Sequence, residues 1–285
     1  MLVIFSSPLL YTNFIRPPKV GNPVPEYIFN DPKLYPFFED ALGAIDGSHF
    51  NAFAASDWDA LCDRNGALTT NALAICNFSM RFLHTQSGWE GSVADAQMFH
   101  DSCFTDLSIP DGKYFLADAG FSTCSTLLVP YRGVWYHLSE WGRAQLRYGT
   151  TTIWIYLQLT LYRPATQEEL FNLRHTRAQN VIERAFGVIK QRFKILVIPP
   201  EYSMDIQARI FPALAAIHNC ILERDPIEIA NILPPSDDGI DVEDHGQLAT
   251  EYPGWAEKDR ANARCEEIVE SMWNNYQTVL RERNL

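Results

Sequence analysis

The sequence lacks any run of about 18 apolar residues, the shortest length that is read as a membrane span. Its first residues also lack the basic start of a signal peptide. The six cysteines form no C-x-x-C pair and lie at no zinc-binding spacing from histidines. We therefore expect an intracellular protein with reduced, mostly buried thiols and no membrane segment.

The chain is also short of positive charge, with a net charge of −12. Of this, −9 belongs to residues 223–285, which contain 15 acidic and 6 basic residues. Residues 174–194 are the opposite, with six Lys or Arg and the single acid Glu183. A basic segment of this kind is typical of phosphate binding, so the overall acidity does not exclude a nucleic-acid partner.

The distribution of proline and charge predicts three parts. Residues 1–40 contain seven prolines and are expected to form an irregular lead-in. Residues 41–225 alternate short apolar runs with amphipathic segments, which predicts one α/β domain. Within it, residues 148–163 have no clean amphipathic period and read as an insertion. Residues 226–285 are expected to form an acidic linker and a terminal helix.

The insertion has one explanation that can be tested directly. Its edges can be encoded by sequences that resemble intron ends, which suggests a retained intron of 16 codons at residues 148–163. Sequencing mature transcripts decides the question, because an intron is excluded if every message contains these codons.

Two apolar runs each deliver an acid to a glycine turn. Residues 113–121 read as a buried strand that ends at Asp118, with Gly120 permitting a sharp turn. Residues 41–49 repeat the pattern and end at Asp46. An acid at a strand end often points into a cleft, although an Asp that merely starts a turn is an equally good reading of either sequence.

Two further acids are placed on helices. Asp95 is expected in the first turn of a helix that follows residue 93, where it either binds a ligand or only stabilises the helix N-terminus. Glu183 lies beside an apolar stripe on a basic helix, where a solvated ion-pair partner is the alternative. If these acids surround one sheet with Asp46 and Asp118, they repel one another unless cations neutralise them. Mg²⁺ and Mn²⁺ accept carboxylate oxygens and support phosphodiester cleavage.

The same residues carry a family resemblance. Residues 44–49 (Ala-Ile-Asp-Gly-Ser-His), 88–96 (Gly-Trp-Glu-Gly-Ser-Val-Ala-Asp-Ala), 114–121, 171–175 and 181–193 resemble the successive blocks of Harbinger-type transposases. This DDE endonuclease family also contains the Harbinger transposase-derived nuclease. The resemblance covers about residues 8–225.

The resemblance implies an RNase H-like mixed sheet flanked by helices, with the acidic C-terminal tail outside it. It also implies a nuclear DNA endonuclease and transposase that uses Mg²⁺ or Mn²⁺. The implied catalytic residues are Asp46, Asp118 and Glu183, and Asp95 is the implied fourth metal ligand. For DNA contact we nominate five basic residues: Arg174, Arg177, Arg184, Lys190 and Arg192.

Departures from the family pattern leave two alternatives open. The family's usual N-terminal helix-turn-helix region has no counterpart ahead of residue 41, so we expect a separate DNA-binding protein to supply recognition. Asn65 also stands where the family usually has glycine. A domesticated copy that binds DNA or protein without cleaving is the first alternative. The second is a phosphohydrolase for small esters, which the basic helix argues against.

Overall fold

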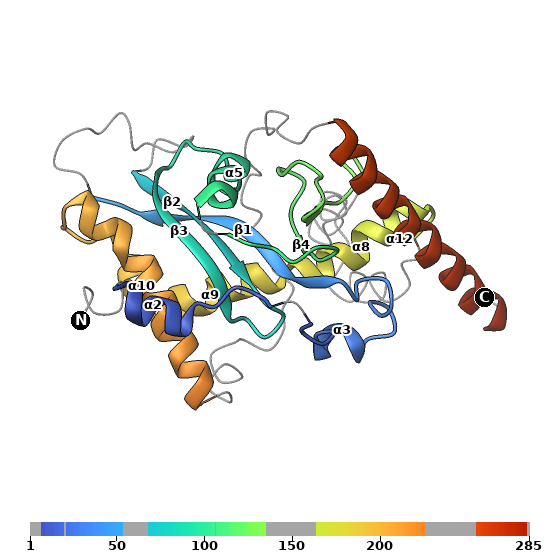
Figure 1. The fold of residues 1–285 in the computed structure, drawn as a ribbon, viewed down its shortest axis with the longest axis horizontal. Helices are drawn as coiled ribbons and strands as arrows, with labels where there is room; N and C mark the ends of the chain where they lie inside the picture. Colours follow the sequence, from blue (N-terminus) through green and yellow to red (C-terminus); the bar gives the residue numbers. More distant parts are fainter. Residues whose placement is uncertain are drawn as a thin grey trace, which may run out of the picture.

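The computed structural model describes residues 7–19, 21–53, 68–105, 107–134, 164–225 and 255–283. A mixed sheet lies at the centre and helices cover both of its faces (Figure 1). The strands are β1 (Ala41–Asn51), β2 (Thr69–Cys76), β3 (Phe82–Glu90), β4 (Tyr114–Leu116) and β5 (Leu127–Leu128). The helices are α2 (Pro8–Phe14), α3 (Glu26–Phe29), α5 (Asp95–Thr105), α8 (Gln167–Gln179), α9 (Val181–Arg192), the 3₁₀ turn η1 (Lys194–Leu196), α10 (Met204–Arg224) and α12 (Trp255–Glu282). None of the described helices is long and apolar enough to cross a membrane.

The five strands are ordered β3-β2-β1-β4-β5. The first three form an antiparallel meander, whereas β4 runs parallel to β1 and β5 parallel to β4. Residues 71–85 contain most of β2 and the start of β3. The chain turns between them because the Asn77 side-chain oxygen accepts the backbone N–H groups of Ser79 and Arg81, each at 3.0 Å.

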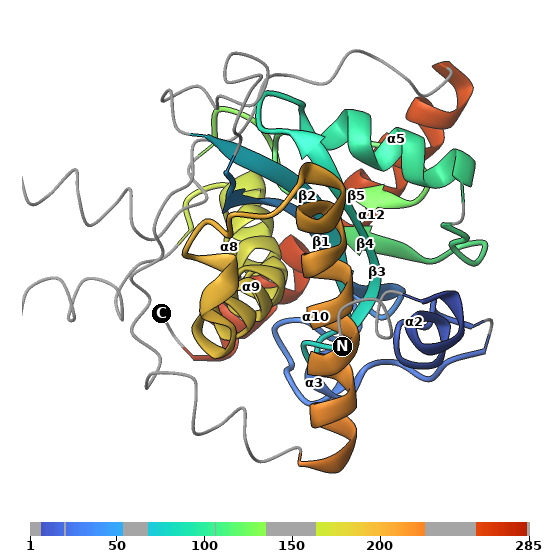
Figure 2. The same ribbon diagram turned by 90° about the vertical axis from the view of Figure 1, so that its left-hand side faces the viewer.

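The sheet separates two hydrophobic clusters, because successive side chains of a strand point to opposite faces. The cluster beneath α5 contains Ile45, Leu73 and Ile75 of the central strands. The larger cluster beneath α8, α9 and α10 contains the alternating residues Ala44 and Phe50. Figure 2 shows α5 on one side of the sheet and these three helices on the other. Each face of β1 therefore faces a different set of helices.

The lead-in is more ordered than its prolines predict. Helices α2 and α3 form within it, and Ile28 and Phe38 are fully buried in the larger cluster. These short helices are compatible with the prolines because proline is tolerated in the first turn of a helix, as Pro8 shows at the start of α2. Residues of the lead-in are thus part of the domain core.

The long helices follow the sequence patterns. Thr166 caps α8 by accepting the Glu169 backbone N–H at 3.2 Å, and the Glu169 carboxylate accepts the Ala165 N–H at 2.8 Å. The apolar stripe of residues 178–193 spans the end of α8 and all of α9, which are separate helices. Helix α12 packs on α8, and its Met272 is fully buried. The suspected insertion at 148–163 and the linker at 226–254 lie outside the described residues.

Two buried histidines bind backbone carbonyls. His175 donates from Nε2 to the Leu128 carbonyl at 2.8 Å, and His218 donates from Nε2 to the Met80 carbonyl at 2.9 Å. His218 Nδ1 lies 2.7 Å from an Arg192 guanidinium nitrogen, which can only donate. Burial lowers the pKa of each histidine to about 4. Both imidazoles are therefore neutral in the fold at neutral pH.

Their burial predicts acid destabilisation. The folded-state pKa of each histidine is below the ordinary value of 6.5, so the unfolded chain binds protons first as the pH falls. The stability that each contributes is complete above pH 6.5 and is lost progressively toward pH 4. We expect His218→Gln to remove about 2 kcal/mol of the wild-type loss between pH 7.5 and pH 5. Urea unfolding at both pH values measures this, and an equal loss in the variant would contradict it.

Candidate active site

Asp46 lies inside β1 and not at its end, which corrects the sequence prediction. The strand continues to Asn51 because its later residues pair with β2 as far as Thr69. On its other side β1 loses its neighbour, since the last pair with β4 joins Ala44 to Leu116. The Asp46 side chain is partly buried, and its Oδ1 accepts the Gly47 backbone N–H at 2.9 Å.

Asp118 follows the end of β4 by two residues, as the sequence predicts. Continuing the parallel register from Ala44 and Leu116 places it opposite Asp46. Its side chain is 8% exposed, and Oδ1 accepts the Gly120 N–H at 3.0 Å. Arg132 braces this turn by donating to the carbonyls of Ala119 and Phe121. The acid is therefore held in a fixed turn beside the open edge of β1.

Three of the acids lie on one face of the sheet. Asp46 shares its side of β1 with Ser48, which accepts a hydrogen bond from Lys190 of α9 at 2.8 Å. Asp118 continues the alternation of β4 from Leu116, which packs in the larger cluster beneath the same helices. Glu183 is in the first turn of α9 and is partly buried.

The pKa of Asp46 reflects the charges of the surrounding acids. Its pKa is raised well above the ordinary value, first by burial and then by the charges of Asp118, Asp95 and Glu183. The Gly47 N–H acts in the opposite direction but does not offset these effects. The charges of the three other predicted acids thus all act on Asp46.

Asp95 reaches Asp46 from the other face. It begins α5, and its Oδ1 accepts a hydrogen bond from Asn71 Nδ2 at 2.8 Å. Asn71 has the same strand parity as Leu73, which packs beneath α5. The Asp95 carboxylate lies against Gly47. Gly47 directly follows Asp46 in β1, so the two residues face opposite sides of the sheet. Asp95 therefore approaches Asp46 from the α5 side of the sheet, and its role as a metal ligand stays a prediction.

The nominated basic residues do not form one exposed stripe. Arg174 is 8% exposed and lies over the Phe37 ring, so it is not available to DNA in this structure. Arg177 forms an ion pair with Asp31 at 2.9 Å. Lys190 binds Ser48, and Arg192 contacts His218. Arg184 is exposed and directly follows Glu183, which makes it the best-placed candidate for a phosphate contact.

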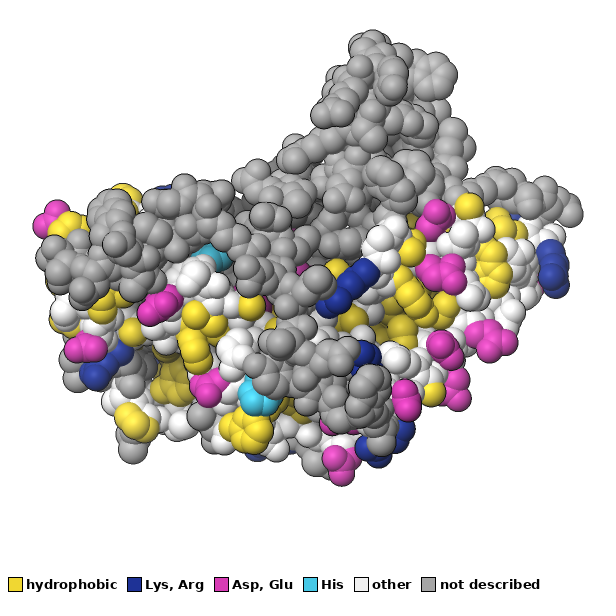
Figure 3. Space-filling model, turned by 90° about the horizontal axis from the view of Figure 1, so that it is seen from above, with side chains coloured by type: hydrophobic (Ala, Val, Ile, Leu, Met, Phe, Trp, Pro, Cys, Tyr) yellow, Lys and Arg dark blue, Asp and Glu magenta, His cyan; other side chains and the backbone are white. Residues whose placement is uncertain are grey.

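Helix packing explains why the number of Lys and Arg residues in this segment did not predict an exposed basic surface. Residues 174–192 span two helices that pack on β1, the lead-in and α12, so some of their long side chains cover apolar surface. Figure 3 views the molecule from the side of α5, where the described Lys and Arg side chains are scattered among acidic and hydrophobic ones.

Residues 45–219, more than half of the chain, match the family described as DDE superfamily endonuclease. The chain belongs to this family. Its mixed five-stranded sheet, flanked by helices, is the RNase H-like arrangement of α/β proteins that the sequence led us to expect.

The chain is similar to two curated proteins named "Putative nuclease HARBI1", from Homo sapiens and Bos taurus. Each is 22% identical over 190 residues, which cover 64% of this chain and 46% of the relative. The chain thus spans less than half the length of these relatives. No solved structure matches it.

The acids of this DDE family member fit a hard divalent cation in chemistry and charge. Their donors are all oxygen, and a cation relieves the repulsion at Asp46. Within the described ranges, no three acidic, His or Cys side chains are already arranged around one ion. Mg²⁺ needs no such cage, because it keeps several waters and is usually bound by one or two carboxylates with substrate phosphates. Asp46 and Asp118, with Glu183 on the same face, meet that requirement.

Sequence reasoning missed two residues of the site. Asn71 and Gly47 hold the Asp95 carboxylate between α5 and the sheet. The available signal was an Asn followed by Ala, Leu, Ala and Ile in a buried strand, where a polar side chain needs a partner.

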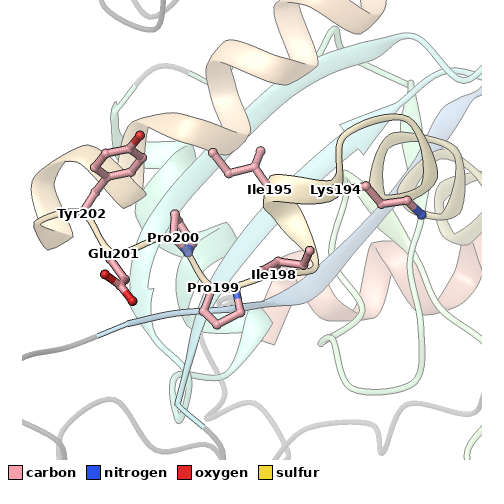
Figure 4. Close-up of a pocket in the computed structure, with 7 residues that line it drawn as sticks. All are labelled: Lys194, Ile195, Ile198, Pro199, Pro200, Glu201 and Tyr202. Carbon is pink, nitrogen blue, oxygen red and sulfur yellow. The ribbon is translucent and has the colours of Figure 1, made fainter.

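A shallow pocket lies apart from these acids. Its volume is about 360 Å³, and it is lined by residues of η1 and the segment before α10: Lys194, Ile195, Ile198, Pro199, Pro200, Glu201 and Tyr202 (Figure 4). None of the four acids lines it. Ile198 and Tyr202 are 64% and 54% exposed.

Proposed function

We propose that this chain is a divalent-metal-dependent DNA endonuclease of the transposase type, with Asp46, Asp118 and Glu183 as its catalytic carboxylates. One observation carries the proposal. Three acids lie on one face of the sheet: Asp46 in β1, Asp118 in the turn after β4 and Glu183 in α9. The charges of Asp118 and Glu183 act on Asp46.

Each residue has a distinct part in this proposal. The Gly47 N–H donates to one oxygen of Asp46, and the Gly120 N–H donates to one oxygen of Asp118. These bonds orient both carboxylates. Glu183 adds the third charge from α9. Bound Mg²⁺ or Mn²⁺ would neutralise these acids, activate a water or a DNA 3′-hydroxyl, and stabilise the leaving oxygen. The same arrangement would serve hydrolysis and strand transfer, since the two differ only in the attacking hydroxyl.

DNA as the substrate is supported by the family and by exposed Arg184 beside Glu183. We propose that the protein acts in the nucleus and that a separate DNA-binding protein selects the target. Purified protein should nick supercoiled plasmid with Mg²⁺ or Mn²⁺ and not with EDTA. If it binds DNA and Mn²⁺ but nicks nothing, the non-cleaving binding module becomes the better description.

The clustered acids also predict that the site lowers stability when no metal is bound. The raised folded-state pKa of Asp46 means that its ionisation destabilises the fold as the pH rises above 3.8. Asp46→Asn keeps an oxygen for the Gly47 N–H and removes the charge. We expect the variant to have a higher Tm than wild type at pH 7.5 in EDTA.

Bound Mg²⁺ should reverse the order of the two Tm values. Mg²⁺ is expected to raise the Tm of wild type, because it binds only the folded state, and to have little effect on Asp46→Asn. Differential scanning fluorimetry measures both effects, with Asp111→Asn on an exposed turn as the matched control. A lower Tm for Asp46→Asn than for wild type in EDTA would show that the acids do not repel one another as described.

A further inference from the structure

The Asp95 carboxylate is held in a preformed seat. Asn71, 2% exposed on β2, donates from Nδ2 to Asp95 Oδ1 at 2.8 Å and to the Val93 carbonyl at 3.1 Å. Both partners are acceptors, which fixes the orientation of the amide. One buried side chain thereby ties the start of α5 to β2 and aims the Asp95 side chain at β1.

Gly47 lies directly against the Asp95 carboxylate in this seat, which is the site formed by Asn71 and Gly47. A Cβ atom on Gly47 would lie 2.1 Å from Asp95 Oδ1 and 2.3 Å from its Cγ. The Gly47 backbone is not in the left-handed region that favours glycine. Glycine is therefore needed here for space and not for conformation, because the carboxylate occupies the place that any side chain would take.

The contact continues to Asp46. The Gly47 N–H is the group that Asp46 Oδ1 accepts, at 2.9 Å. A side chain that fixes Gly47 from the α5 face consequently fixes the backbone donor that orients the Asp46 carboxylate on the α9 face. Asn71, Asp95, Gly47 and Asp46 form one continuous chain of contacts through the sheet.

We propose that Asp95 is a positioning residue that acts on Asp46 through Gly47, and that Asn71 holds it in place. This inference rests on the proposed function, in which Asp46 is a catalytic carboxylate. It assigns Asp95 a role different from metal binding, and it adds two residues, Asn71 and Gly47, to the working site.

The decisive variants separate shape from charge. Asp95→Asn retains an oxygen for the Asn71 amide, whereas Asp95→Ala empties the seat. We expect Asp95→Ala to reduce the maximal nicking rate roughly 10-fold to 100-fold, as for a misplaced catalytic group. Asp95→Asn should therefore retain most of the wild-type nicking rate, whereas Asn71→Ala should resemble Asp95→Ala. Half-saturating Mn²⁺ should change less than about twofold in all three, whereas Asp46→Asn weakens Mn²⁺ binding.

Compensation gives a test that metal binding cannot imitate. Gly47→Ala alone should be strongly impaired, because its new methyl group meets the Asp95 carboxylate. In the double variant Gly47→Ala/Asp95→Ala, the space is free and the methyl group fills part of it. The double variant should therefore be more active than Gly47→Ala alone. If the two defects simply add, the seat does not act through Gly47 and the proposal is wrong.

Two readouts besides activity keep the outcomes separate. Calorimetric titration with Mn²⁺ reports ligand residues, so a loss of affinity in Asp95→Asn as large as in Asp46→Asn would make Asp95 a ligand and overturn the proposal. Hydrogen exchange of the Gly47 amide should accelerate in Asp95→Ala even if wild type cuts no DNA. Unchanged exchange would overturn positioning, whereas absent nicking with accelerated exchange would count against the endonuclease function alone.

Discussion

Replacing Asp118 with Asn is expected to reduce Mg²⁺- or Mn²⁺-dependent nicking of DNA by roughly 10³-fold or more. Asn has the same shape, and its Oδ1 can still accept the Gly120 N–H that now holds Asp118 at 3.0 Å. What it lacks is the negative charge at the turn opposite Asp46. The loss would therefore measure charge and not folding, and the metal-free Tm should not fall.

The matched control is Asp111→Asn, on the exposed turn just ahead of β4. It removes the same charge a few residues from Asp118 and should nick like wild type. Conversion of supercoiled plasmid to the open circle, followed at saturating Mn²⁺, measures all three proteins. Asp118→Asn activity within tenfold of wild type would mean that the assigned mechanism is wrong.

The largest expected loss of stability comes from Asn219→Ala. Asn219 is fully buried in α10, and its side chain binds both backbone groups of Phe82 in the edge strand β3. Its Oδ1 accepts the Phe82 N–H at 2.9 Å, and its Nδ2 donates to the Phe82 carbonyl at 2.7 Å. Nδ2 also donates to the Phe14 carbonyl of α2 at 2.9 Å. Alanine would remove the Asn219 partner from two buried backbone groups and one part-buried group, which we expect to lower the free energy of unfolding by about 3–5 kcal/mol.

Urea unfolding measures this loss, and the Tm should fall by roughly 10 °C. Asn275→Ala, at an exposed position of α12, is the matched control and should be neutral or slightly stabilising, because alanine favours helix. Asn219→Asp distinguishes hydrogen bonding from packing, since it keeps the size but turns a carboxylate toward two carbonyls, and it should also destabilise. A cost below about 1 kcal/mol for Asn219→Ala would show that the three bonds contribute little.

Local patterns sufficed where the physics is local. The apolar run before Asp118 and the glycine after it specify a buried strand and a turn, and the structure has both. Thr166 and Glu169 specify the start of α8 through bonds within one helical turn. The apolar stripes of α9 and α10 likewise follow from helical periodicity alone.

Errors arose where a neighbour distant in the sequence decides. Asp46 resembled a strand end, yet β1 continues because β2 supplies partners for its later residues. Arg174 resembled a solvated base, yet the lead-in places Phe37 beneath its guanidinium. Neither partner could be recognised from the few residues around the side chain in question.

By itself the sequence determined which acids this protein has, the elements that carry most of them, and the DDE endonuclease family to which it belongs. Only the tertiary structure decided that Asp46, Asp118 and Glu183 lie on one face of the sheet and that Asp95 approaches Asp46 from the other. The physical reason is strand parity: alternate side chains of a strand point to opposite faces. Which face meets which helix depends on how the strands pair and the helices pack, and not on any local pattern.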